Sequence, residues 1–127
     1  MGDWKIWLSE YQRWDPLTGW TELSRTFETL DKDLYLALSL KDETQVMKIY
    51  AADGERMLVE HTRLSSPAIK SVLYDRSQTQ YVPIYNSANG QIWEDLPPEM
   101  CVNKALAKET LKYFYETKQQ FRRRDAG

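Results

Sequence analysis

The chain is poor in the residue types that most often carry chemistry. Its 127 residues include one histidine, His61, and one cysteine, Cys101. A zinc site needs several cysteine or histidine ligands at short spacings, so these two residues cannot form one. The five glycines are scattered, and none of the glycine-rich spacings of phosphate-binding loops occurs. We therefore expect no metal and no other cofactor.

Two further absences limit where the chain acts. A single cysteine cannot form an internal disulfide, which agrees with a reducing compartment. The sequence has no run of about 18 apolar residues, and its N-terminus lacks the basic and then apolar pattern of a signal peptide. These features predict a cytoplasmic protein that makes no membrane contact.

Groups for catalysis do not converge along the sequence. His61 lies in an alternating stretch typical of a strand and has no sequence-local partner. Cys101 stands before a predicted helix, but its apolar neighbours indicate a packed residue. Glu94 and Asp95 are adjacent, and adjacent strand residues point to opposite faces. We expect no enzyme activity; the alternative is a small enzyme or ligand-binding module with a helix–sheet pocket near His61.

Composition predicts one folded domain, residues 1–127, with a short basic tail at 122–127. Hydrophobic residues make up 42% of the chain and charged residues 28%, as in ordinary globular proteins. The formal net charge is -2. Without the tail the body has 14 basic and 18 acidic residues, so it repels phosphate. We expect no direct contact with nucleic acid.

The hydrophobic periodicity predicts a strand, a helix, about six short strands and a final helix. Residues 4–11 alternate as in an edge strand, and Asp15-Pro16 is typical of a helix start, although Gly19 allows a start after it. Further strands are predicted at residues 34–40, 46–52, 57–62, 69–74, 81–85 and 91–95, with turns at Asp53-Gly54 and Asn89-Gly90. Pro83 marks its strand as an edge strand.

This order of elements predicts an α+β fold. Consecutive strands joined by short turns form an antiparallel meander sheet of about six strands. The N-terminal helix, ending near residue 31, and the C-terminal helix, over about residues 103–119, should pack on that sheet. Oligomeric state stays open.

The last third of the chain has the most distinctive pattern. The predicted strand at residues 91–95 is followed, after Leu96, by Pro97-Pro98, which cannot donate to a sheet. Asn103 is a predicted helix cap. Apolar residues then recur at helical spacing, namely Leu106, Ala107, Leu111 and Phe114. This segment, from Met100-Cys101-Val102 to Thr117-Lys118-Gln119, resembles the first-numbered immunity-protein family of bacterial polymorphic toxin systems.

The resemblance covers residues 34–119, and it implies an antitoxin. Many members of that family neutralise toxins of the deaminase type. The resemblance thus implies a protein that binds a cognate toxin domain, one acting on nucleic acid such as a deaminase or nuclease, and blocks it without chemistry of its own. Besides the enzyme or ligand-binding module, a structural adaptor that displays aromatic strands is the other alternative.

One stretch of sequence combines acidic and aromatic residues. Residues 77–103 contain no lysine or arginine. We define the acidic sector as the residues of this stretch, and one just before it, that suit a cationic partner: Asp75, Tyr81, Tyr85, Trp93, Glu94, Asp95 and Glu99. Toxins that act on nucleic acid present cationic surfaces to phosphate. We therefore predict that the acidic sector binds the toxin, with the carboxylates steering association and the rings as anchors.

Overall fold

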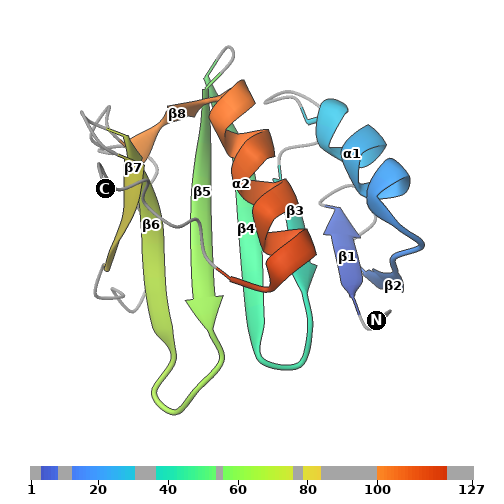
Figure 1. Ribbon diagram of the computed structural model, residues 1–127, viewed down its shortest axis with the longest axis horizontal. Helices are drawn as coiled ribbons and strands as arrows, with labels where there is room; N and C mark the ends of the chain where they lie inside the picture. The colour runs from blue at the N-terminus through green and yellow to red at the C-terminus, as the bar shows by residue number, and fades with distance from the viewer. Residues whose placement is uncertain are drawn as a thin grey trace.

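The computed structural model describes residues 4–8, 13–30, 37–53, 56–75, 79–83 and 100–119, and for residues 52, 53, 75 and 79–83 it describes the backbone alone. The strands are β1 (Lys5–Leu8), β2 (Trp14–Pro16), β3 (Ala37–Lys41), β4 (Gln45–Asp53), β5 (Arg56–Arg63), β6 (Ile69–Asp75), β7 (Thr79–Pro83) and β8 (Val102–Asn103). The helices are α1 (Trp20–Glu28) and α2 (Lys104–Thr117). Both helices lie on one face of the sheet (Figure 1).

The sheet is antiparallel, in the order β2-β1-β3-β4-β5-β6-β7, with β8 paired to the start of β5. Strands β3 to β7 follow one another in chain order, so the predicted α+β meander is confirmed. Pro83 ends β7, the last strand of the order, as its missing N–H predicts. The predicted strand at residues 91–95, the turn at Asn89-Gly90 and the basic tail at 122–127 lie outside the described residues.

The N-terminal part differs from the prediction in two ways. The first strand, β1, was predicted to lie at an edge of the sheet. It lies inside the sheet, because β2 pairs with it on the outer side. Asp15 and Pro16, predicted to start the helix, belong to β2, an edge strand that tolerates a proline. The helix begins after Gly19, the alternative start, and Glu22 accepts a 2.8 Å hydrogen bond from the amide of Thr18. It ends at Glu28, earlier than residue 31.

Helix α2 begins and ends where the sequence predicts. The side chain of Asn103 accepts a hydrogen bond of 2.7 Å from the amide of Leu106, which confirms the predicted cap. After Thr117 the chain leaves the helix through Lys118, which has a left-handed backbone with φ of 61°. The amide of Lys118 donates to the carbonyl of Phe114 at 2.7 Å and closes the last turn.

Removing the cap of α2 should destabilise the protein measurably. Asn103→Ala leaves the Leu106 amide without its acceptor, and such a loss costs about 0.5–2 kcal/mol. Chemical denaturation should show this decrease in the free energy of unfolding. Asn103→Asp keeps an acceptor oxygen and should retain most of the stability. Equal losses in both variants would show that the cap hydrogen bond is not the cause.

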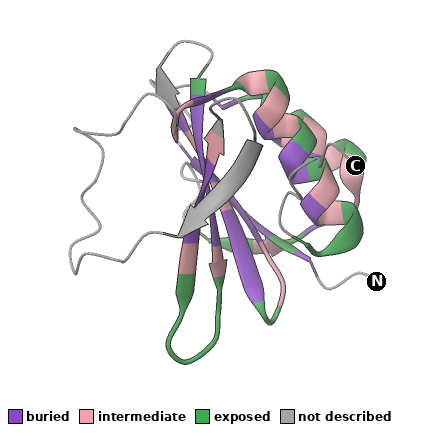
Figure 2. Ribbon diagram, turned by 60° about the vertical axis from the view of Figure 1, so that its left-hand side comes forward, coloured by how far each residue is buried: buried purple, intermediate pink, exposed green. Residues whose placement is uncertain are grey.

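The core lies between the helices and the sheet (Figure 2). The helices contribute the fully buried residues Leu23, Phe27, Ala107, Leu111 and Phe114. The strands contribute alternate residues on the same face, namely Leu38, Leu40, Met47, Ile49, Val59 and Leu73, all fully buried. This period of two is the pattern from which the strands were predicted. From α2, the Phe114 ring packs onto this face of the sheet and contacts the rings of Trp4 and His61.

Candidate functional site

The structure describes little of the acidic sector. Asp75 is the last residue of β6, and its backbone pairs with that of Thr79. Tyr81 lies in β7, opposite Leu73. Tyr85, Trp93, Glu94, Asp95 and Glu99 lie outside the described residues. The role of the acidic sector in binding therefore stays a prediction.

His61 belongs to a buried polar network between the sheet and the end of α2. Its side chain has no exposed surface, and its Nε2 lies 2.7 Å from Oε1 of Gln45. The Gln45 amide nitrogen donates to the carbonyl oxygen of Lys118 at 2.7 Å. Since this bond fixes the amide, Oε1 accepts, and His61 carries its proton on Nε2. The network thus ties β4 and β5 to the C-terminal end of α2.

His61 has the environment of a structural histidine. The ring of Phe114 meets it edge-on, with centroids 5.6 Å apart. Burial, assisted by the charge of Arg63, lowers the pKa of His61 from 6.5 to about 4. The side chain lines neither of the two hollows described below. The alternative of a pocket that uses His61 therefore gains no support from the geometry.

The buried histidine makes stability depend on pH. Because its pKa is lower in the folded protein than in the unfolded chain, the unfolded chain binds more protons between pH 6.5 and about 4. The free energy of unfolding should fall as pH falls through this window, by about 3 kcal/mol from this residue. Denaturant titrations at several pH values between 7 and 4 measure the change.

His61→Gln separates this effect from the titration of carboxylates. Glutamine keeps an N–H donor for Gln45 but does not titrate. The variant should start less stable and lose less stability on acidification, so that the two proteins converge towards pH 4. A constant difference between them from pH 7 to pH 4 would contradict the predicted pKa of His61.

A second feature is a pair of hollows that meet at Trp4, a core residue that is 8% exposed. The sheet-end hollow has a volume of about 530 Å³, and its lining includes Trp4, Lys5, Pro16, Lys41, Asp42 and Glu43. The helix-end hollow, of about 570 Å³, lies beside Leu17, Thr18, Tyr115 and Lys118. Both volumes fall in the usual range of ligand pockets.

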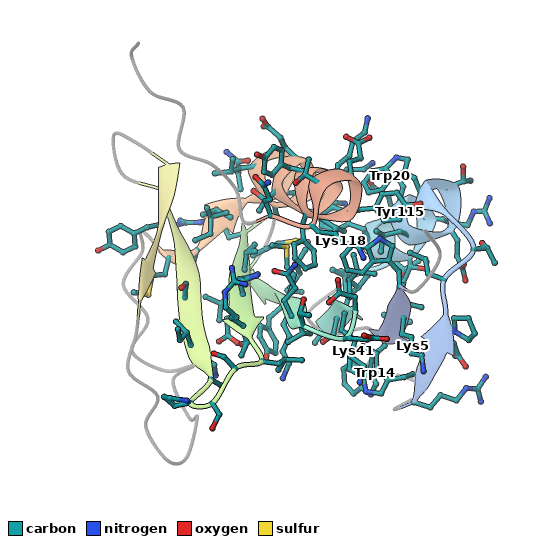
Figure 3. The ribbon with its side chains drawn as sticks, turned by 60° about the horizontal axis from the view of Figure 1, so that its bottom comes forward. Lys5, Trp14, Trp20, Lys41, Tyr115 and Lys118 are labelled. Atoms are coloured by element: carbon teal, nitrogen blue, oxygen red, sulfur yellow. The ribbon has the colours of Figure 1, made fainter. Side chains whose placement is uncertain are left out.

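Aromatic rings and a lysine pack together beside the helix-end hollow. The rings of Trp4 and Tyr115 are stacked with centroids 6.1 Å apart, and Trp20 lies 5.9 Å from Tyr115. The ammonium of Lys118 lies 5.4 Å from the Trp4 ring, within cation–π range. Figure 3 shows Trp20, Tyr115 and Lys118 beside the helices. These rings join the N-terminal part of the chain to α2 at the margin of the core.

Asp42, in the lining of the sheet-end hollow, forms an ion pair with Lys118, in the lining of the helix-end hollow. Its carboxylate accepts hydrogen bonds from the amides of Thr44 and Gln45 at 2.7 and 3.1 Å, and Lys118 Nζ lies 3.4 Å away. Burial alone would raise the pKa of Asp42, but the hydrogen bonds from Thr44, Gln45 and Lys118 outweigh it and keep the pKa below its usual value. Asp42 therefore stays charged and engaged within the protein.

Metal-ligating side chains are not gathered together in the described ranges. Among the described residues no group of three or more His, Cys, Asp or Glu side chains is placed to hold a metal ion. Cys101 is half-buried and stands alone. The packing of rings around Trp4 was not predicted, although four of the five tryptophans fall within the first 20 residues. That concentration was the available signal.

Comparisons of the chain with protein-family models, with curated proteins and with solved structures give no significant match. Neither of the helices in the described ranges is long and apolar enough to cross a membrane.

Proposed function

We propose that the chain is an immunity protein that binds a cognate bacterial toxin domain and blocks it sterically and electrostatically, without catalysis. The observation that carries this proposal is the C-terminal third, which resembles the first-numbered immunity-protein family. Its helix begins at the Asn103 cap and packs on a meander sheet through Leu111 and Phe114. In the described part of the chain, a meander followed by a capped helix supports the proposal.

The charge pattern of the sequence supports the same proposal. A stretch of 27 residues without lysine or arginine, residues 77–103, contains Glu94, Asp95 and Glu99. A toxin that acts on nucleic acid needs a cationic groove, and the acidic sector is complementary to it. Electrostatic potentials of opposite sign on the two partners accelerate association, because they steer the partners towards each other during diffusion. Tyr and Trp side chains are the usual anchors of such interfaces.

The alternative functions are less well supported. A ligand-binding module or small enzyme near His61 needs an accessible imidazole, whereas His61 has no exposed surface. A structural adaptor predicts binding without inhibition. The proposed inhibitor and the adaptor are therefore distinguished by an activity assay on the partner.

The experiment is a titration, with the purified chain, of a toxin domain encoded by a gene adjacent to that of this chain. We expect toxin activity to be lost at one equivalent, and the association rate to fall as salt is raised. Complex formation with full toxin activity would favour the adaptor. Full toxin activity without complex formation would contradict the proposal.

A further inference from the structure

The hairpin that joins β5 to β6 carries an exposed apolar end. Residues 63–69, which we call the hairpin end, are all exposed. In the described part of the chain three large hydrophobic side chains are exposed, and two of them lie on the hairpin end, Leu64 at 49% and Ile69 at 52%. Pro67 and Ala68 lie between them. Single exposed hydrophobic residues are common on protein surfaces, whereas a group of them marks an interaction site.

The hairpin end is convex and is held in place at its base. It extends past the neighbouring turn between β3 and β4 (Figure 1, Figure 2). The amide of Leu64 donates to the carbonyl of Thr44 in that turn at 2.8 Å. Within the hairpin end, the hydroxyl of Ser65 donates to the carbonyl of Pro67 at 2.8 Å. These bonds position the apolar residues before a partner arrives, which reduces the entropy lost on binding.

The stretch of sequence that contains the hairpin end has positive charge. Residues 61–74 include Arg63 and Lys70 and no aspartate or glutamate. Arg63 is exposed and is the direct partner of Ile69 in the register of β5 with β6, so both side chains are on one face. Lys70 is on the other face, where its ammonium lies 3.9 Å from the carboxylate of Glu60. An apolar recess with a carboxylate at its rim would complement Ile69 and Arg63 together.

We propose that the hairpin end docks into an apolar recess of the toxin domain, with a carboxylate of the toxin beside Arg63. This inference rests on the proposed function and adds a second contact surface to the acidic sector. The hairpin end and Asp75 lie at opposite ends of β6, about 20 Å apart at the usual rise per residue. A standard interface buries about 800 Å² of each partner, which is enough to include both.

The charge of Arg63 indicates that the recess lies outside the substrate groove of the toxin. A groove that binds nucleic acid is cationic, so it attracts the acidic sector and repels an arginine. Two other occupants fit the hairpin end less well. Its two large aliphatic side chains are fewer apolar groups than one acyl chain, which alone binds a membrane only marginally. A second copy of the chain, seated symmetrically on the hairpin end, would bring two Arg63 side chains together.

The test is the kinetics of binding between the purified chain and a toxin domain encoded by an adjacent gene. Leu64→Ser and Ile69→Ser should each weaken the affinity about tenfold, chiefly through faster dissociation. This loss should be similar at low and moderate salt, because screening acts on charges. Ile69→Val keeps an apolar side chain and should retain most of the affinity. Trp14→Ser, which removes the third exposed hydrophobic residue, should retain it as well.

The outcomes separate this inference from the proposed function. All variants compared must keep the melting temperature of the parent chain. If the parent chain inhibits the toxin and both serine variants bind as tightly as Ile69→Val, only the inference about the hairpin end is wrong. If the parent chain neither binds nor inhibits the toxin, both are wrong.

Two further measurements examine the other occupants. Sedimentation with anionic phospholipid vesicles measures membrane binding, and analytical ultracentrifugation measures self-association. If the serine variants lose vesicle binding or self-association but keep the toxin affinity of the parent chain, the inference is overturned in favour of a membrane or a second copy. Equal behaviour of parent and variants in both measurements, with weaker toxin binding by the serine variants, would support the toxin as the occupant.

Discussion

Truncating Phe114 to alanine should destabilise the protein by about 3–5 kcal/mol, the range for a large aromatic side chain lost from a packed core. Phe114 has no exposed surface, and its ring lies 5.1 Å from Trp4 and 5.6 Å from His61, measured between centroids. The ring therefore joins α2 both to the N-terminal tryptophan and to the buried polar network. Equilibrium denaturation of the variant measures the loss.

Glu109→Ala is the matched control, because Glu109 lies on the exposed side of the same helix. We expect its effect to stay within about 0.5 kcal/mol. A loss below about 1 kcal/mol for Phe114→Ala would show that α2 does not depend on this packing. The assignment of the helix–sheet core would then be wrong.

Reversing two charges of the acidic sector should weaken the toxin complex. Glu94→Lys with Asp95→Lys places positive charge against a cationic groove, which slows association and costs about 2–5 kcal/mol for any desolvated contact. Kinetics of binding to the toxin domain at several salt concentrations measure both effects. The weakening should be largest at low salt, since screening reduces the repulsion.

The control for this variant carries the same change in net charge elsewhere. Glu109 and Glu116 lie on the exposed side of α2, and reversing both to lysine alters the charge of the chain equally. We expect a much smaller effect on binding from this control. Both variants must keep the melting temperature of the parent chain. Equal weakening by the two variants, or none by either, would contradict the acidic-sector mechanism.

The sequence predicts the middle and the end of the fold well, because local signals suffice there. Alternation of apolar residues marks the paired strands β3 to β6, and the Asn103 cap marks the start of α2. The structure of the N-terminal part depends less on local sequence signals. Asp15-Pro16 is typical of a helix start. In the structure these two residues form a strand instead, because they pair with Ile6 and Lys5 of β1. Tertiary pairing there overrides the local preference.

The candidate binding groups were predictable only where charge is contiguous in sequence. Glu94 and Asp95 are adjacent, so the acidic sector is visible in the printed chain. Leu64 and Ile69 are residue types typical of a core, and they are exposed because their hairpin extends past the neighbouring turn. Likewise, the contact between Gln45 and Lys118 joins the start of β4 to the end of α2. Such features follow from topology, which periodicity alone does not determine.

The proposed immunity function is tested most directly by survival of cells that express a toxin domain encoded by a gene adjacent to that of this chain. The proposal predicts that co-expression of this chain restores growth, and that an unrelated immunity protein expressed to the same level does not. Restored growth should be reduced by the Glu94→Lys and Asp95→Lys reversal and kept by the Glu109 and Glu116 control. Cells that die equally with and without the soluble, folded chain would contradict the proposed function.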